Sequence, residues 1–395
     1  MEFPEDSYFK LNRVVLSAIG LWPYDDFKVR HFRFLLSLLI IISFISPQLL
    51  KLLISEYSLD LFLNMFCYNI IFVMLCAKYI SFYAILKNIK EFRDRVRNNW
   101  DALKDNQEIE IICKHENRGK VFTIFIIVLS YTVISLYIFL QCTSVLLDIV
   151  MPLNESRPRE LIFPAEYFID QQKYFYILTI HVLMGLFFIA TSAIATESFS
   201  LANALHAFGL FNIASYRMKN ILIGINRQRD ICLNKEYAIS CNKIIAAVDF
   251  HRRAIEFSEL LKESFGPMYL ILFMGCVCSA GVGLSNLSRI IMMEKEIVSV
   301  VKYSACIILT ITGLALANYA GQEFINCDTD VYRAICNTKW YNASLKTQKL
   351  VLFLIQKTTK CYKVDAGGMF SPCLEGLATA LSMSVSYFMV LHSSV

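Results

Sequence analysis

The chain has 395 residues, of which 56% are hydrophobic, 13% aromatic and only 18% charged, with a formal net charge of +5. Its mean hydropathy is +0.50. Soluble globular domains carry about a quarter charged residues. The composition therefore excludes an ordinary soluble protein and indicates an integral membrane protein.

Seven segments approach or exceed the roughly 20 apolar residues with which a helix crosses a membrane. In chain order they are 32–54, 61–86, 121–147, 174–196, 267–287, 297–318 and a weaker one at 374–391. None alternates like a barrel strand, and a helix satisfies its own backbone groups in lipid. We predict an all-α polytopic membrane protein. Its acidic start and long first apolar run favour a retained anchor over a signal peptide.

The distribution of Lys and Arg predicts the orientation of these helices. With the N-terminus in the cytosol, 29 of the 38 basic residues fall in cytosolic segments and 5 in outer ones. Positive charge marks the cytosolic side, so we predict a cytosolic N-terminus and an extracellular C-terminus. Asn154 heads a sequon in an outer connection and is a candidate glycosylation site, whereas the sequon at Asn286 lies close to the membrane.

The three long inner connections, 87–120, 209–266 and 319–373, do not resemble disordered linkers. Apolar residues recur there at helical spacing, as in Ile89, Phe92 and Val96. No Gly/Ser-rich linker or internal repeat divides the chain. We predict that extended helices pack below the membrane as a cytosolic anchor layer, and that residues 1–395 form a single domain.

The sequence contains 13 cysteines, but the outer connections 148–173 and 287–296 contain none of them. We therefore expect free thiols and no disulfide framework. The cysteine pairs lack zinc-ligand spacing and His partners, and no nucleophile–base pair or phosphate loop is present. We expect no metal, no cofactor, no nucleic-acid partner and no enzymatic activity.

The last predicted span has an unusually polar face, whose members are separated by three or four residues. They are Glu375, Thr379, Ser382, Ser386, Val390 and Ser393. Polar faces at membrane depth contact protein or water. Two interpretations remain open from these residues alone. The stripe lines a pore that narrows at apolar Val390, or its small residues permit close helix packing.

Several short motifs resemble those of one receptor family. They are Gly20-Leu21-Trp22-Pro23, Gly321-Gln322, Trp340-Tyr341, Ala366-Gly367-Gly368-Met369-Phe370 and Ser386-Tyr387-Phe388-Met389-Val390-Leu391. With the length, helix count and orientation, the whole chain resembles an insect odorant receptor. The resemblance implies an odorant-gated, non-selective cation channel in the plasma membrane of sensory-neuron dendrites. Such channels are tetramers that include a shared co-receptor, and the seventh helices surround the pore.

The resemblance also implies roles for individual segments. The inner connections leave little room for the long insertion of the co-receptor, which indicates an odorant-tuning subunit. Val390 falls on the hydrophobic gate of the family, whereas Ser393 stands where the co-receptor pattern has a polar amide. The pore positions implied are therefore Thr379, Ser382, Ser386, Val390 and Ser393.

In this family a small, volatile, hydrophobic ligand lies among the outer halves of helices two, three, four and six. The side chains at those depths are Phe62, Phe66, Asn69 and Val73; Ser135, Phe139 and Cys142; Ile177, His181, Met184 and Phe188; and Tyr303, Ser304 and Ile307. A mostly apolar wall with few polar groups suits such a ligand. Ordinary bundle core explains the same residues, and a neutral His181 bonded to a hydroxyl is the alternative to a ligand contact.

Other seven-helix and transport classes fit less well. A G-protein-coupled receptor has the opposite orientation, and neither Asp-Arg-Tyr after helix three nor Asn-Pro-x-x-Tyr in helix seven is present. A transporter is expected to show repeats and interrupted helices. A gustatory-type channel of the same superfamily remains the nearest alternative, although its seventh-helix motif ends in Gln-Phe, which is absent here.

Overall fold

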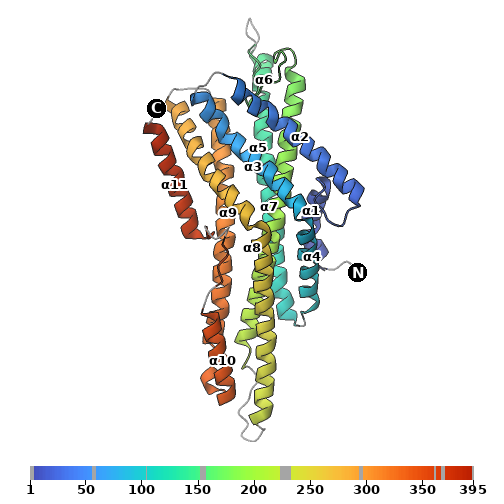
Figure 1. Cartoon of the computed structure of the whole chain (residues 1–395), viewed down its shortest axis with the longest axis vertical. Helices are drawn as coiled ribbons and strands as arrows, with labels where there is room; N and C mark the ends of the chain where they lie inside the picture. The colour runs from blue at the N-terminus through green and yellow to red at the C-terminus, as the bar shows by residue number, and fades with distance from the viewer. Residues whose placement is uncertain are drawn as a thin grey trace.

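The computed structural model describes residues 4–55, 59–103, 105–151, 157–222, 233–292, 297–359, 362–365 and 370–393. The chain is all-helical over these residues (Figure 1). The elements are α1 (Pro4–Ala18), α2 (Phe27–Ile54), α3 (Leu59–Ala84), α4 (Leu86–Asp101), α5 (Asn106–Gln141), α6 (Thr143–Val150), α7 (Phe175–Lys219), α8 (Leu233–Met292), α9 (Ile297–Cys336), the 3-10 turn η1 (Trp340–Asn342), α10 (Leu345–Thr358) and α11 (Leu374–Ser393).

Seven of the described helices are long and apolar enough to cross a membrane. They are α2, α3, α5, α7, α8, α9 and α11. This confirms the predicted fold class and the predicted number of spans. The two ends of the bundle are named here by that prediction: the outer end carries the segment 157–174, and the orientation itself remains a prediction.

The observed helices run well past the predicted spans. The span predicted at 121–147 belongs to α5, which starts at Asn106 and stops at Gln141, where the separate helix α6 follows. The Asp105 carboxylate accepts a hydrogen bond from the Gln107 amide and so caps the start of α5. α7 and α9 continue inward beyond their spans, whereas α8 begins far on the inner side. Their inner halves and α10 occupy the lower half of Figure 1.

The inner layer is held together by buried aromatic and charged groups. Phe92 on α4 stacks on Phe265 of α8, with ring centroids 5.5 Å apart, and the predicted apolar face of α4 is buried. Arg217 on α7 bonds both carboxylate oxygens of Glu108 at 2.6 and 2.8 Å. A bidentate pair of this kind fixes orientation as well as distance. The extended helices therefore form one packed layer, on which the spans stand.

Candidate functional site

The outer segment 157–174 enters the helix bundle and contributes an aromatic side chain to its core. Phe163 is almost completely buried. Its ring centroid lies 4.9 Å from that of Tyr68, 5.4 Å from Phe72 and 5.5 Å from Tyr137. The contacts with Tyr68 and Phe72 are edge-to-face, an arrangement in which rings attract one another in addition to burying area. Phe163 comes from a segment without helical periodicity, which explains why analysis of helix faces missed it.

Gln141, the last residue of α5, fixes the start of this segment. Its Oε1 accepts from the Ile162 amide at 2.8 Å, and its Nε2 donates to the Glu160 carbonyl at 3.3 Å. A buried backbone group without a partner is costly, so these two bonds stabilise the entry of the chain into the core. Gln141 therefore helps to hold the backbone on the N-terminal side of Phe163 in place.

A second attachment ties the later part of the segment to α2. The Glu166 amide donates to the Pro47 carbonyl at 2.8 Å, and its carboxylate lies 3.2 Å from the Lys51 ammonium. A hydrogen bond from the Phe168 amide, followed by the Lys51 contact, lowers the pKa of the Glu166 carboxyl. Phe168 adopts a φ of 54°, an uncommon backbone conformation that lets the chain turn sharply there.

His181 on α7 bonds two hydroxyl groups. Its Nε2 lies 3.1 Å from Ser43 Oγ on α2, and its Nδ1 lies 3.0 Å from Tyr167 Oη in the outer segment. Both ring nitrogens are therefore occupied, as in the hydroxyl-bonded alternative that the sequence left open. The imidazole joins α2, α7 and the outer segment.

The predicted ligand-site residues divide by exposure. Buried or half-buried positions are Phe62, Phe66, Asn69, Cys142, His181, Phe188, Tyr303, Ser304 and Ile307. Within this group Phe62, Phe66 and Tyr303 share one apolar cluster, and Tyr303 Oη donates to Asn64 Oδ1. Exposed positions on the outside of the described chain are Val73, Ser135, Phe139, Ile177 and Met184. The structure does not bring these five into the interior. The sequence could not separate them from the buried group, because a lipid-facing surface is as apolar as a core.

Lys302, near the outer end of α9, is a buried cation in the aromatic core. Its ammonium donates to the Ile162 carbonyl at 3.3 Å, and it lies 5.5 and 5.0 Å from the ring centroids of Tyr68 and Tyr303. Tyr137 Oη donates to the Lys302 carbonyl at 3.1 Å. The sequence places Lys302 within a span, but its aromatic neighbours follow from the tertiary fold.

The last span, α11, lies along one side of the bundle and packs mainly on α8 and α9 (Figure 1). Its buried strip consists of small residues, Gly376, Ala380 and Ser384. A Cβ added to Gly281 of α8 would lie 2.9 Å from the Tyr387 Cβ, closer than real side chains approach. The close approach of the two helices therefore requires glycine at position 281.

The predicted pore stripe lies away from this buried strip. Thr379, Ser382 and Ser386 are exposed, and Val390 is 64% exposed. At 3.6 residues per turn the stripe lies roughly 120° around the helix from the buried strip. The Ser393 side chain and Asn154 fall outside the described residues. The Asn286 side chain is buried and donates to the Leu63 carbonyl at 2.9 Å, so it is not accessible for glycosylation.

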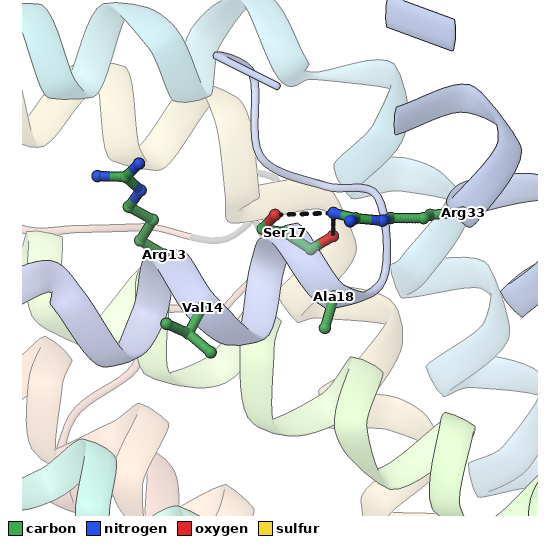
Figure 2. A pocket seen from close by; sticks show the side chains of 5 residues that line it. All are labelled: Arg13, Val14, Ser17, Ala18 and Arg33. Carbon is green, nitrogen blue, oxygen red and sulfur yellow. Dashed lines mark hydrogen bonds between the residues drawn. The ribbon is translucent and has the colours of Figure 1, made fainter. Parts of the chain in front are cut away.

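Two hollows occur elsewhere on the described surface. One, of about 450 Å³, lies between α1 and the start of α2. Figure 2 shows the side chains that line it, which are Arg13, Val14, Ser17, Ala18 and Arg33. The Arg33 guanidinium there donates to the carbonyl and the hydroxyl of Ser17, both at 3.0 Å. The other, of about 340 Å³, lies between the outer end of α8 and Phe388. Neither is lined by the predicted ligand-site residues.

These observations define a seven-helix polytopic membrane protein with a buried aromatic core below an inserted outer segment. The chain belongs to the 7tm odorant receptor family, whose model matches residues 58–385. It is 23% identical over 198 residues to Odorant receptor 22c of Drosophila melanogaster, covering 50% of this chain and 48% of that relative. The aligned part therefore spans about half the length of that relative.

Two solved structures share the fold over nearly the whole chain. The insect olfactory receptor OR5 of Machilis hrabei in complex with eugenol superposes with a TM-score of 0.81, at 14% identity and 98% coverage of both chains. The structure of the same receptor described without eugenol gives a TM-score of 0.77, at 15% identity, covering 98% of this chain and 97% of that one.

Proposed function

We propose that this chain is the odorant-binding, tuning subunit of a heteromeric odorant-gated cation channel that it forms with a shared co-receptor. The proposed site of action is the plasma membrane of olfactory-neuron dendrites. Family membership supports a receptor for small volatile molecules, and the eugenol complex of OR5 supports a ligand of that size. The tuning role is inferred from the inner connections, which are too short to hold the long insertion of the co-receptor.

The exposed polar stripe on α11 is the observation that carries the channel proposal. α11 buries only a narrow strip of small residues in its own subunit, while Thr379, Ser382 and Ser386 remain exposed. Hydroxyl groups at membrane depth require contact with water or with other protein. Four subunits arranged around an axis supply that environment, because each stripe then faces a shared aqueous path. Val390 provides the apolar constriction that closes the path by excluding water.

Electrophysiology of cells expressing this chain with and without the co-receptor tests the proposal. We expect odorant-evoked cation current only when both are present. Single cysteines introduced from Thr379 to Val390, probed with a water-soluble thiol reagent during activation, should change current with the period of the stripe. Reactivity confined to the buried strip, or odorant current that requires a G protein, would contradict the proposal.

A further inference from the structure

Two lysines, Lys78 and Lys302, are buried within the spans, and they differ in whether a carboxylate neutralises them. Lys78 on α3 pairs with the Glu197 carboxylate on α7, which also accepts from Tyr269 Oη at 2.8 Å. Lys302 has no carboxylate within ion-pair distance in the described part of the chain. A buried charge without a counter-ion is strongly unfavourable. Lys302 therefore lacks the compensation that the same bundle gives Lys78.

The groups around Lys302 provide only part of the hydrogen bonding that a buried ammonium needs. An ammonium has three N–H donors, and the residues that the structure describes offer it one acceptor, the Ile162 carbonyl at 3.3 Å. The ring faces of Tyr68 and Tyr303 provide favourable cation–π contacts, but rings do not replace the missing acceptors. Lys302 is 7% exposed, so the membrane surroundings do not supply them either.

The second unsatisfied group is the hydroxyl of Tyr68, whose ring lies beside the same ammonium. Tyr68 is 4% exposed, and its Oη has no hydrogen-bond partner among the described residues. A buried hydroxyl without a partner is destabilising. Two donors from different helices, α3 and α9, thus lie in one aromatic enclosure and share the need for an oxygen acceptor.

We propose that Lys302 and Tyr68 bind the carboxylate of the odorant, so that this subunit is tuned to small volatile carboxylic acids. This inference rests on the proposed function. The ligand carboxylate supplies the absent counter-ion and accepts from the Tyr68 hydroxyl, while its hydrocarbon part packs against Phe72, Phe163 and Tyr137. Phe163 is buried among these rings, so binding requires that side chain to move.

The test compares matched odorants on cells that express this chain with the co-receptor. A straight-chain or aryl acid, its methyl ester, its alcohol and the parent hydrocarbon are applied at equal concentrations. The acid should be the most potent of each set in the wild type. If the ester is equally potent, recognition requires no negative charge and the proposal is wrong.

Substitutions then assign the effect to the two donors. Lys302→Met retains the length and removes the charge, and we expect acid potency to fall about 10- to 100-fold, the usual weight of a hydrogen bond to a charged group. Ester and hydrocarbon responses should remain or increase. Tyr68→Phe should reduce acid potency by a smaller factor. Lys173→Met, at an exposed lysine in the outer segment, is the matched control and should change nothing.

Surface labelling separates a folding defect from a binding defect. If Lys302→Met does not reach the surface, Lys302→Arg is tested in its place, because it keeps the charge and alters its position. A shift in the acid-to-ester potency ratio of Lys302→Arg would then support binding of the acid by Lys302, and an unchanged ratio would contradict it. Unchanged acid potency in correctly expressed variants would overturn the inference alone. A wild type that gives no current to any volatile in the presence of the co-receptor would instead overturn the proposed function.

Discussion

Ser384 on α11 donates a hydrogen bond of 3.3 Å to the Val277 carbonyl on α8. This bond lies in the narrow strip of small residues by which the last helix is attached to its own subunit. Because so little of α11 is buried, a change at that strip should alter the position of the whole helix.

Replacing Gly281 with alanine should displace α11. The new side chain would collide with the Tyr387 Cβ and the Ser384 carbonyl, which lie 2.9 and 3.0 Å from an added Cβ. Overpacking of this kind costs about 1–3 kcal/mol. We expect reduced odorant-evoked current per surface-labelled receptor. Gly313→Ala is the matched control, since an added Cβ there meets nothing within 4 Å, and equal losses in both variants would contradict the assignment.

The Lys78–Glu197 pair should respond asymmetrically to substitution. Lys78 is 1% exposed and Glu197 is 38% exposed. Glu197→Gln leaves a deeply buried ammonium without a counter-ion, and we expect the free energy of unfolding to fall by about 3 kcal/mol. Lys78→Met leaves only the half-exposed carboxylate and should cost less. Thermal unfolding of detergent-solubilised protein measures both, and equal melting temperatures for the two variants would count against this account.

The attachment of the outer segment should depend on pH. The Phe168 amide and the Lys51 ammonium lower the pKa of Glu166 below its ordinary 4.5. A carboxyl whose pKa is lowered by folding stabilises the folded state above its unfolded pKa, and the contribution is lost as the pH falls through the folded pKa. Thermal unfolding from pH 7 to pH 3 should therefore show a stability loss below about pH 4.5. Glu166→Gln should remove that part of the pH dependence.

A polar residue at position 390 should open the proposed gate. Val390→Ser places a hydroxyl at the apolar constriction, so water can enter the closed path. We expect ligand-independent current to increase, although co-receptor subunits still contribute their own gate residues. Val385→Ser is the control, because Val385 is also exposed but lies on another face of α11. An increase with Val385→Ser and none with Val390→Ser would show that the pore does not lie on the proposed face of α11.

The orientation of the termini is testable without any ligand. An epitope tag before Met1 should be labelled only after permeabilisation, and a tag after Val395 should be labelled on intact cells. The reversed pattern would contradict the orientation predicted from 29 inner and 5 outer basic residues, and with it the proposed channel arrangement.

The sequence predicted the seven spans because lipid requires long apolar helices, and this requirement is visible in composition alone. It did not predict where those helices stop. The separation of α5 from α6 at Gln141 and Cys142 carries no strong terminator such as Gly or Pro. The inward continuation of α7 and α9 depends on packing in the inner layer and not on hydropathy.

The site was less predictable than the fold for a different reason. Regular spacing identifies a helix face but not the partner of that face, so exposed Phe139 and Met184 were grouped with buried Tyr303. In membranes both lipid and core favour apolar side chains. Phe163 could not be found from periodicity, because it enters from a connection. Lys302 was visible in the sequence, but only the assembled bundle shows that no carboxylate of the described residues lies near it.

The insertion of Phe163 places part of the aromatic core on a connecting segment and not on a membrane-spanning helix. Connections tolerate substitution better than packed helices do, and this one provides part of the wall of the aromatic core. Under the proposed function, a substitution near position 163 should therefore alter odorant selectivity without changing the helices themselves. Under the same proposal, the spans, the inner layer and α11 keep the surfaces that assembly with the co-receptor requires.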